Sequence, residues 1–143
     1  MMRRSALLLL AVLVAACGGD SDSGTGEAGV RVSFDEPLRV GPVTWSVVVT
    51  NDTDDDLELT FATGQRADVS LVRGDEVVYQ WSRGQLFTQV VGSLRIPAGG
   101  RRTFTLDEPG IDVDPGVYTL TAVVSASNRT DLRHTREVTV EPM

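Results

Sequence analysis

Residues 114–127 read DPGVYTLTAVVSAS, and this stretch carries the strongest indication of the fold. Its first five residues match the D-x-G-x-Y pattern of the tyrosine corner, in which a tyrosine hydroxyl bonds to backbone just upstream of a strand. From Val117 onward, apolar residues alternate with polar ones, which is typical of a strand that buries one face. The pattern predicts a turn at Asp114–Gly116, followed by a strand that Tyr118 fixes at its start.

Similar short alternating segments occur along the rest of the chain, separated by turn residues. Gly74-Asp75 lies between two of them and is typical of a hairpin turn. No window of useful length has apolar residues at the spacing of an amphipathic helix. The sequence therefore predicts an all-β fold, an antiparallel immunoglobulin-like β-sandwich of about 8–9 strands. The other segments that we expect to be strands are Val30–Phe34, Val43–Asn51, Leu57–Phe61, Val69–Leu71, Val77–Ser82, Leu94–Ile96, Thr103–Leu106 and Glu137–Glu141.

The amino terminus resembles the signal sequence of a bacterial lipoprotein. Arg3 and Arg4 are positively charged, and the apolar run at residues 6–16 is about half the roughly 20 residues that a membrane-spanning helix needs. The run ends in Val14-Ala15-Ala16-Cys17, which is similar to a lipobox. This resemblance implies cleavage before Cys17 and acylation of its thiol. The alternative is an ordinary signal peptide, cut just before a free cysteine.

We expect the chain to have three parts. Residues 1–16 form the signal peptide, and residues 17–29 hold the lipidated cysteine and a flexible linker rich in glycine and serine. Residues 30–143 form one β-sandwich domain, long enough to bury a single core. Cys17 is the only cysteine, so the domain has no internal disulfide and its stability must come from the core. The expected location is the extracytoplasmic face of the cell membrane, where only the lipid anchor touches the membrane.

The strand that follows the tyrosine corner differs from its counterpart in antibody domains. Leu120 stands two residues after Tyr118, where antibody domains keep a disulfide cysteine. We expect an apolar contact there in place of the bridge.

Charge and composition restrict the classes of partner. The formal net charge is −7 at pH 7, and an acidic surface repels nucleic acid and anionic headgroups. We therefore expect no nucleic-acid partner, and no cofactor is indicated by any motif. His134 is the only histidine and lies between Arg133 and Thr135, so we interpret it as a surface residue. No G-x-S-x-G motif accompanies it, and we expect that the protein is not an enzyme.

The densest acidic stretch runs from Asn51 to Glu58. Asp52, Asp54 and Asp56 have the spacing of a calcium loop, but the glycine and glutamate of an EF-hand loop are missing downstream. Asparagine and aspartate also favour turns because their side chains bond nearby backbone. We expect a turn and no metal site, with a calcium loop as the alternative.

Two further segments, Leu59–Val69 and Val78–Gln89, combine strands with glycine-containing loops. The simplest interpretation places the aromatic residues in the core and lets the glutamines satisfy backbone groups of the loops. The aromatic residues are Phe61, Trp81 and Phe87, and the glutamines are Gln65, Gln85 and Gln89.

These two segments resemble the BsuPI family, also called the intracellular proteinase inhibitor family. The resemblance covers about Val43 to Val124, and its motifs come in the family's order. The matching residues are Phe61, Gly64-Gln65, Asp68, Trp81-Ser82, Gly84, Phe87-Thr88-Gln89, Ile96-Pro97-Ala98-Gly99 and Pro115-Gly116-Val117-Tyr118. The chain departs from the family where Ala67 replaces an aromatic residue before the aspartate.

The resemblance implies a β-sandwich that inhibits subtilisin-like serine proteinases. An inhibitory loop should be exposed and rigid, because preorganisation reduces the entropic cost of binding. Our candidate is the turn from Ser82 to Thr88, with Leu86 or Phe87 entering an apolar specificity pocket. The residues of this candidate loop are Ser82, Arg83, Gly84, Gln85, Leu86, Phe87 and Thr88, and those of a secondary loop are Gly64, Gln65 and Arg66.

An immunoglobulin-like binding or scaffold module of the cell envelope is the alternative function. The partner is then another envelope protein and not a proteinase. The position of Phe87 distinguishes the two hypotheses: a buried ring favours the scaffold, and an exposed ring at a loop tip favours the inhibitor. The family name refers to an intracellular activity, whereas the signal sequence predicts export.

Overall fold

The computed structural model describes residues 27–143, so Cys17 and the predicted signal sequence lie outside the described residues. Within this range the chain forms nine strands. None of the residues described here belongs to a helix long and apolar enough to cross a membrane. The strands are β1 (Ala28–Ser33), β2 (Gly41–Asn51), β3 (Leu57–Phe61), β4 (Ala67–Arg73), β5 (Glu76–Gln80), β6 (Gly92–Ile96), β7 (Arg101–Ile111), β8 (Gly116–Val124) and β9 (Arg133–Val140).

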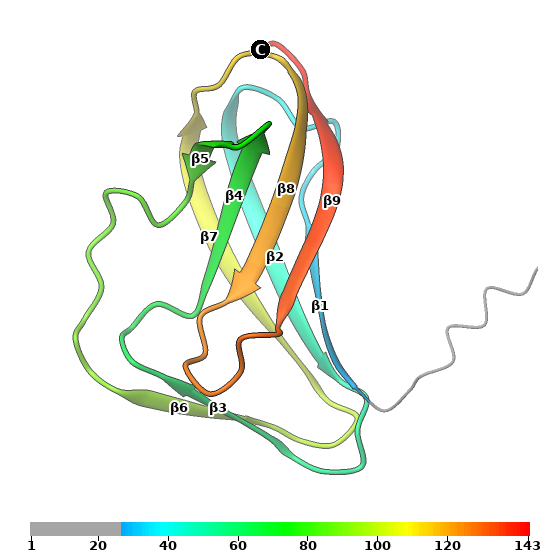
Figure 1. Ribbon diagram of the computed structural model, residues 1–143, viewed down its shortest axis with the longest axis vertical. Coiled ribbons are helices and arrows are strands. Elements are labelled where there is room, and N and C mark those ends of the chain that lie inside the picture. Colours follow the sequence, from blue (N-terminus) through cyan, green and yellow to red (C-terminus); the bar gives the residue numbers. More distant parts are fainter. Residues whose placement is uncertain (1–26) are drawn as a thin grey trace, which may run out of the picture.

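Two antiparallel sheets pack face to face, which confirms the prediction of an all-β sandwich (Figure 1). One sheet has the strand order β1-β2-β7, and the other has the order β5-β4-β8-β9. The alternation of β2 shows how the core forms: Trp45, Val47 and Val49 are fully buried, while the residues between them are only partly buried. Removal of such apolar side chains from water is the main stabilising term of the fold.

The tyrosine corner forms as its motif predicts. The Tyr118 hydroxyl donates a hydrogen bond to the Asp114 carbonyl, four residues upstream. The Arg73 guanidinium lies 4.3 Å from the centre of the Tyr118 ring and covers it from the neighbouring strand. Leu120 is fully buried, so an apolar side chain does fill the place of the missing cysteine. The predicted hairpin joins β4 to β5, with Gly74 at a φ of +61°, a conformation that glycine adopts without strain.

β3 and β6 form a separate two-stranded ribbon below the two sheets (Figure 1). Asn128, after β8, fixes this ribbon to the sandwich. Its Nδ2 donates to the Glu58 carbonyl at 2.8 Å, and its Oδ1 accepts from the Thr60 backbone N–H at 2.9 Å. The chain reaches the ribbon from β5 through residues 81–91, which contain no strand and bow outward beside β7 (Figure 1).

Candidate functional site

The candidate loop Ser82–Thr88 begins immediately after β5, in a tight turn. The backbone N–H of Arg83 donates to the Gln80 carbonyl at 3.1 Å, and that of Gln85 donates to the Ser82 carbonyl at 3.0 Å. Gly84 has a φ of +82°, in the left-handed region where a side chain would strain the backbone. The turn therefore leaves the sandwich in a defined direction.

A buried carboxylate in β4 holds the first residue of this loop. Asp68 is 7% exposed and accepts hydrogen bonds on both oxygens. Oδ1 accepts from the backbone N–H of Ser82 at 3.0 Å and of Val69 at 2.9 Å. Oδ2 accepts from the Ser82 hydroxyl at 2.6 Å and from Gln80 Nε2 at 2.7 Å. Four donors compensate the cost of burying this group, since a buried carboxylate is tolerated only when it is well satisfied.

The role of Asp68 was visible in the sequence only indirectly. It interrupts an apolar strand, Ala67–Val72, and a charged residue at such a position needs partners. The sequence did not indicate that Gln80 and Ser82, more than ten residues downstream, are among these partners.

Two half-buried aromatic rings support the middle of the loop. The ring centroids of Trp81 and Phe87 are 5.9 Å apart. Trp81 Nε1 also donates to the Asp107 carbonyl on β7 at 3.0 Å, which fixes the indole against the edge of the other sheet. Phe61 is fully buried, as the core interpretation predicts, whereas Trp81 and Phe87 are only partly buried. Phe87 is therefore neither a core residue nor the exposed tip of the loop.

The secondary loop lies against the far end of the candidate loop. The Gly64 backbone N–H donates to the Thr88 carbonyl at 2.8 Å. A Cβ on Gly64 would lie 2.5 Å from Thr88 Oγ1, so the Thr88 side chain occupies the space that a larger residue at position 64 would need. Gln65 Nε2 donates to the Ala67 carbonyl at 3.4 Å, as expected for a side chain that satisfies loop backbone. The structure thus brings together the two loops that the sequence singled out.

Arg66 completes the secondary loop and faces the β3–β6 ribbon. Its guanidinium lies 4.4 Å from the centre of the Phe61 ring, and its Nη1 donates to the Thr63 carbonyl at 2.8 Å. A Cβ on Gly92 would lie 2.8 Å from Arg66 Nη2, so this arginine also lies close to the start of β6.

Leu86 is the exposed side chain of the candidate loop, at 99% of its full accessible area. Val90 and Val91 follow in the same connection and are 68% and 70% exposed. One connection thus carries three apolar side chains that are exposed to solvent.

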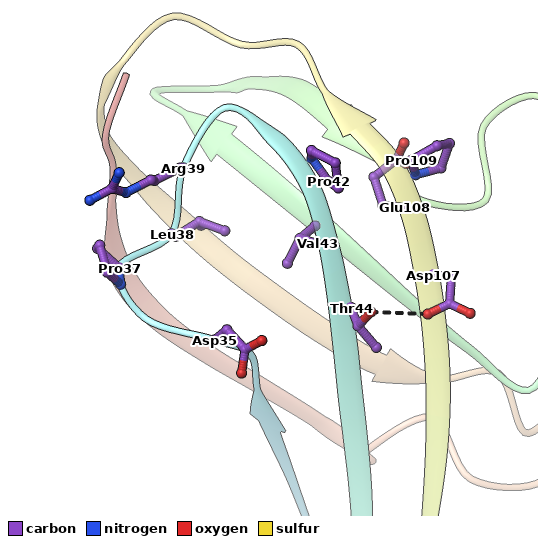
Figure 2. Close-up of a pocket in the computed structure, with 10 residues that line it drawn as sticks. All are labelled: Asp35, Pro37, Leu38, Arg39, Pro42, Val43, Thr44, Asp107, Glu108 and Pro109. Atoms are coloured by element: carbon purple, nitrogen blue, oxygen red, sulfur yellow. Dashed lines mark hydrogen bonds between the residues drawn. The ribbon is translucent and has the colours of Figure 1, made fainter. Parts of the chain in front are cut away.

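A buried polar chain supports β7 behind the loop. Trp45 Nε1 donates to the Tyr79 hydroxyl at 3.2 Å, and the Tyr79 hydroxyl donates to Glu108 Oε2 at 3.0 Å. Burial raises the pKa of Tyr79 well above its usual range, so the phenol stays protonated and can donate. Glu108 and Asp107 also line a hollow of about 420 Å³ between the β1–β2 connection and β7, where Thr44 donates to Asp107 Oδ1 (Figure 2).

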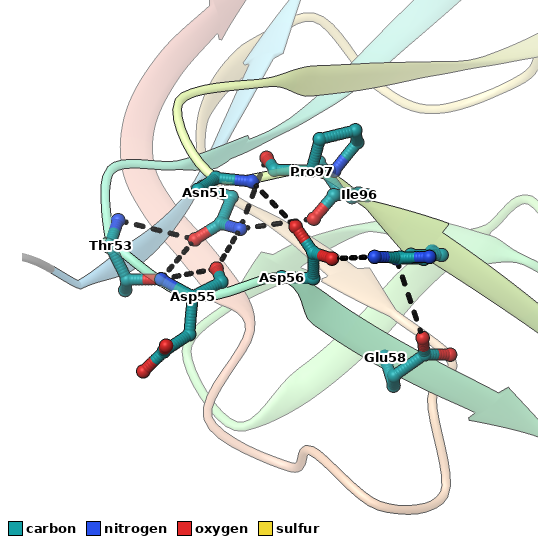
Figure 3. Close-up of polar contacts among 9 residues, drawn as sticks. Asn51, Thr53, Asp55, Asp56, Glu58, Ile96 and Pro97 are labelled. Carbon is teal, nitrogen blue, oxygen red and sulfur yellow. Dashed lines mark hydrogen bonds and ion pairs between the residues drawn. The ribbon is translucent and has the colours of Figure 1, made fainter.

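The acidic stretch forms a turn around Asn51, which is fully buried (Figure 3). Its Nδ2 donates to the carbonyls of Asp55, Ile96 and Pro97, and its Oδ1 accepts from the Thr53 hydroxyl at 2.6 Å. The adjacent Asp56 pairs with Arg95 of β6. Among residues 27–143, no group of three or more acidic, histidine or cysteine side chains is placed to hold a metal ion.

His134 lies on β9, half-buried, in a hollow of about 450 Å³ that Ser33 and Glu36 also line. Ser33 and His134 share no hydrogen bond there. This serine and this histidine therefore do not form a hydrogen-bonded pair of nucleophile and base.

The solved structures that resemble this chain share its fold and have low sequence identity to it. No curated protein matches it in sequence. Among solved structures, it is similar to Spo0M, a sporulation control protein from Bacillus subtilis, at 16% identity and a TM-score of 0.50, covering 81% of this chain and 50% of Spo0M. A CARDB domain from Pyrococcus furiosus matches at 13% identity and a TM-score of 0.43, covering 80% of this chain and 88% of that domain. The chain thus spans half the length of Spo0M, and this likeness concerns the fold alone.

A comparison with protein-family models gives a match that includes the candidate loop and the secondary loop. A family model described as intracellular proteinase inhibitor, BsuPI, matches residues 30–129. This range includes Asp68, Ser82, the candidate loop and the tyrosine corner. The chain therefore belongs to the BsuPI intracellular proteinase inhibitor family.

Proposed function

We propose that this domain inhibits a serine proteinase of the subtilisin type and that Leu86 is the side chain that enters the specificity pocket of the enzyme. The observation that carries the proposal is the contrast between a fully exposed Leu86 and the fixed ends of its loop. Ser82 is bonded to Asp68 at one end, and Thr88 is bonded to Gly64 at the other. A loop held in this way loses little conformational entropy on binding.

The neighbouring side chains fit the same role. Phe87 packs on Trp81 and supports the loop from below, so Leu86 is the better candidate for the pocket. Val90 and Val91 add exposed apolar surface to the same connection. A single large side chain in an apolar pocket commonly dominates such an interface, and its loss costs about 2 kcal/mol or more.

The test is a titration of subtilisin with the purified chain, without its signal, followed through hydrolysis of a chromogenic peptide. Leu86→Asp should weaken inhibition by about thirtyfold or more. Val117→Asp is the matched control, since Val117 is 52% exposed on β8, outside the loop, and its replacement should leave inhibition unchanged. Equal inhibition by both variants would exclude Leu86 as the specificity residue.

A variant that changes which proteinase is inhibited tests the proposal more directly than a variant that only loses inhibition. Trypsin-type pockets carry a carboxylate at their base and select basic side chains. Leu86→Arg should therefore weaken inhibition of subtilisin and introduce inhibition of trypsin. No inhibition of subtilisin by the unmodified domain at micromolar concentration would overturn the proposed function.

We further propose that the domain acts outside the cytoplasm, held to the membrane by lipid on Cys17. The lipobox-like Val14-Ala15-Ala16-Cys17 supports this location. Cells that express the full chain should incorporate labelled palmitate into it, and Cys17→Ser should abolish the label. Labelling that survives Cys17→Ser would contradict the proposed anchor.

A further inference from the structure

A third hollow lies between the outward loop and β7, and Leu86 does not line it. It has a volume of about 480 Å³. Residues 102–106 of β7 line it, together with Trp81, Phe87, Leu94 and Arg66. We call this hollow the β7 groove. In Figure 1 the connection between β5 and β6 bows outward on this side of β7.

The β7 groove runs along the edge of a strand and not across the face of a sheet. Consecutive residues of a strand point to opposite faces, so a hollow that touches five of them in a row must follow the strand edge. In the described part of the chain, β7 pairs with β2 on one side, and no strand pairs with its other side. Trp81 occupies this edge at Asp107, so the part that is available to a further strand is the one around Thr103 and Thr105.

The hydrogen-bonding direction of β7 follows from one contact. The Asp107 carbonyl accepts from Trp81 Nε1, so it points away from β2. In an antiparallel ladder, outward-pointing residues alternate with residues that bond the neighbouring strand. Thr105 and Thr103 therefore direct their backbone N–H and C=O groups into the groove, while Phe104 bonds toward β2.

The side chains of the groove define what would fit there. Phe104 and Leu106 are 9% and 5% exposed and supply an apolar floor toward the core. Arg102 has the same parity as these two residues and so projects to the same side of β7. Neither Arg102 nor Arg66 forms an ion pair with a carboxylate of residues 27–143. In a chain of net charge −7, the only charged side chains among the described residues that line this groove are these two arginines, so its lining is locally positive.

We propose that the β7 groove binds an extended segment of a partner protein, which adds to β7 as a strand. Main-chain hydrogen bonds to Thr103 and Thr105 hold the segment, and alternate side chains select it, as in other cases of strand addition. The segment carries apolar side chains over Phe104 and Leu106 and an acidic side chain facing Arg66 and Arg102. The acidic class follows from charge complementarity, since neither arginine pairs with a carboxylate of residues 27–143.

The test uses a labelled seven-residue peptide, Thr-Leu-Thr-Leu-Thr-Glu-Thr. In the antiparallel orientation its two leucines lie opposite Leu106 and Phe104, and its glutamate lies opposite Arg102. Binding to the domain without its signal is followed by fluorescence anisotropy and by amide hydrogen exchange in NMR spectra. The peptide should slow exchange at Thr103 and Thr105 and leave Phe104 unaffected. Unchanged exchange at both threonines would overturn the proposal.

Reversal of the charge of Arg102 shows whether this residue recognises the acidic side chain of the peptide or only affects folding. Arg102→Glu should weaken binding of the peptide by about fivefold or more, and a peptide with lysine in place of glutamate should restore it. Arg101→Glu is the matched control, because Arg101 is the preceding residue of β7 and points to the other face. Equal effects of the two reversals would overturn the assignment of the acidic side chain. Association of two copies through β7 without peptide would replace the partner segment with a second copy.

The peptide-binding proposal does not depend on Leu86, although Phe87 of the candidate loop and Gly64 of the secondary loop line the groove. Leu86 does not line the β7 groove, so Leu86→Asp should leave peptide binding unchanged while it weakens proteinase inhibition. A loss of peptide binding in Leu86→Asp would contradict two separate sites.

Discussion

Asp68 and Ser82 are joined by two hydrogen bonds, although they lie fourteen positions apart in the sequence. The carboxylate accepts the Ser82 backbone N–H on Oδ1 and the Ser82 hydroxyl on Oδ2, at 3.0 and 2.6 Å. One side chain of β4 therefore fixes where the candidate loop begins. The consequences for stability and loop position can be measured separately.

Replacement of Asp68 should destabilise the whole domain. Asp68→Ala leaves the backbone N–H of Ser82 and the amide of Gln80 without their acceptor, and buried groups that lose a partner cost about 1–3 kcal/mol each. We expect the free energy of unfolding in urea to fall by about 2–4 kcal/mol. Asp75→Ala, in the exposed β4–β5 turn, is the control and should change it by less than about 0.5 kcal/mol. A change in Asp68→Ala as small as the control would contradict this account.

Substitution of Gly64 should displace the far end of the loop. The new methyl group of Gly64→Ala would lie 2.5 Å from Thr88 Oγ1, so Thr88 must move. We expect a loss of about 1–3 kcal/mol in the free energy of unfolding. Thr88→Ala removes the clashing oxygen, so the double variant should recover most of the loss, and a double-mutant cycle measures this coupling. Additive effects of the two changes would show that the clash is relieved elsewhere.

Asn51 should be essential for the turn that its side chain organises. Asn51→Asp replaces an amide that donates to three carbonyls with a carboxylate that faces the same carbonyls. Because buried polar groups then lose their donor, we expect a fall of about 2–4 kcal/mol in the free energy of unfolding. Asp52→Asn, one residue later and exposed, is the matched control. Calcium should not restore Asn51→Asp, and rescue by calcium would revive the calcium-loop interpretation.

Asp131 should titrate at unusually low pH. A hydrogen bond from Arg129 lowers the pKa of Asp131 to about 2. The unfolded value is about 3.9, so the pair contributes its stabilisation above about pH 4 and loses it as the pH falls toward 2. An NMR titration of the side-chain carboxyl should show this midpoint, and Arg129→Gln should return it toward the unfolded value. A midpoint that does not respond to Arg129→Gln would contradict the assigned cause.

The fold was largely predictable because its signals are local. Leu57–Phe61 matches β3 at both ends, and Gly74-Asp75 and the tyrosine corner lie where their motifs place them. Alternation along a strand and the conformational needs of a turn depend on neighbouring residues only. Strand ends were less accurate: Thr103–Leu106 was expected, whereas β7 extends from Arg101 to Ile111.

The site was only partly predictable because its contacts are distant in sequence. The resemblance pointed to both loops, and the family match confirms the resemblance. It did not predict that Gly64 contacts Thr88 or that Trp81 bonds Asp107, since such pairs arise only when the two sheets pack. The choice between Leu86 and Phe87 also required the structure, because both are apolar neighbours and only their exposure differs.

The two fixed ends of the loop divide its residues into a framework and a replaceable part. In residues 27–143, the side chains of Arg83, Gln85 and Leu86 make no hydrogen bond or ion pair, so other residues can replace them without disturbing Asp68 or Gly64. If this loop binds the target as proposed, changes at these three exposed positions should alter the target while the sandwich stays the same. The same property makes it a suitable frame for loop grafting and for selection from randomised libraries.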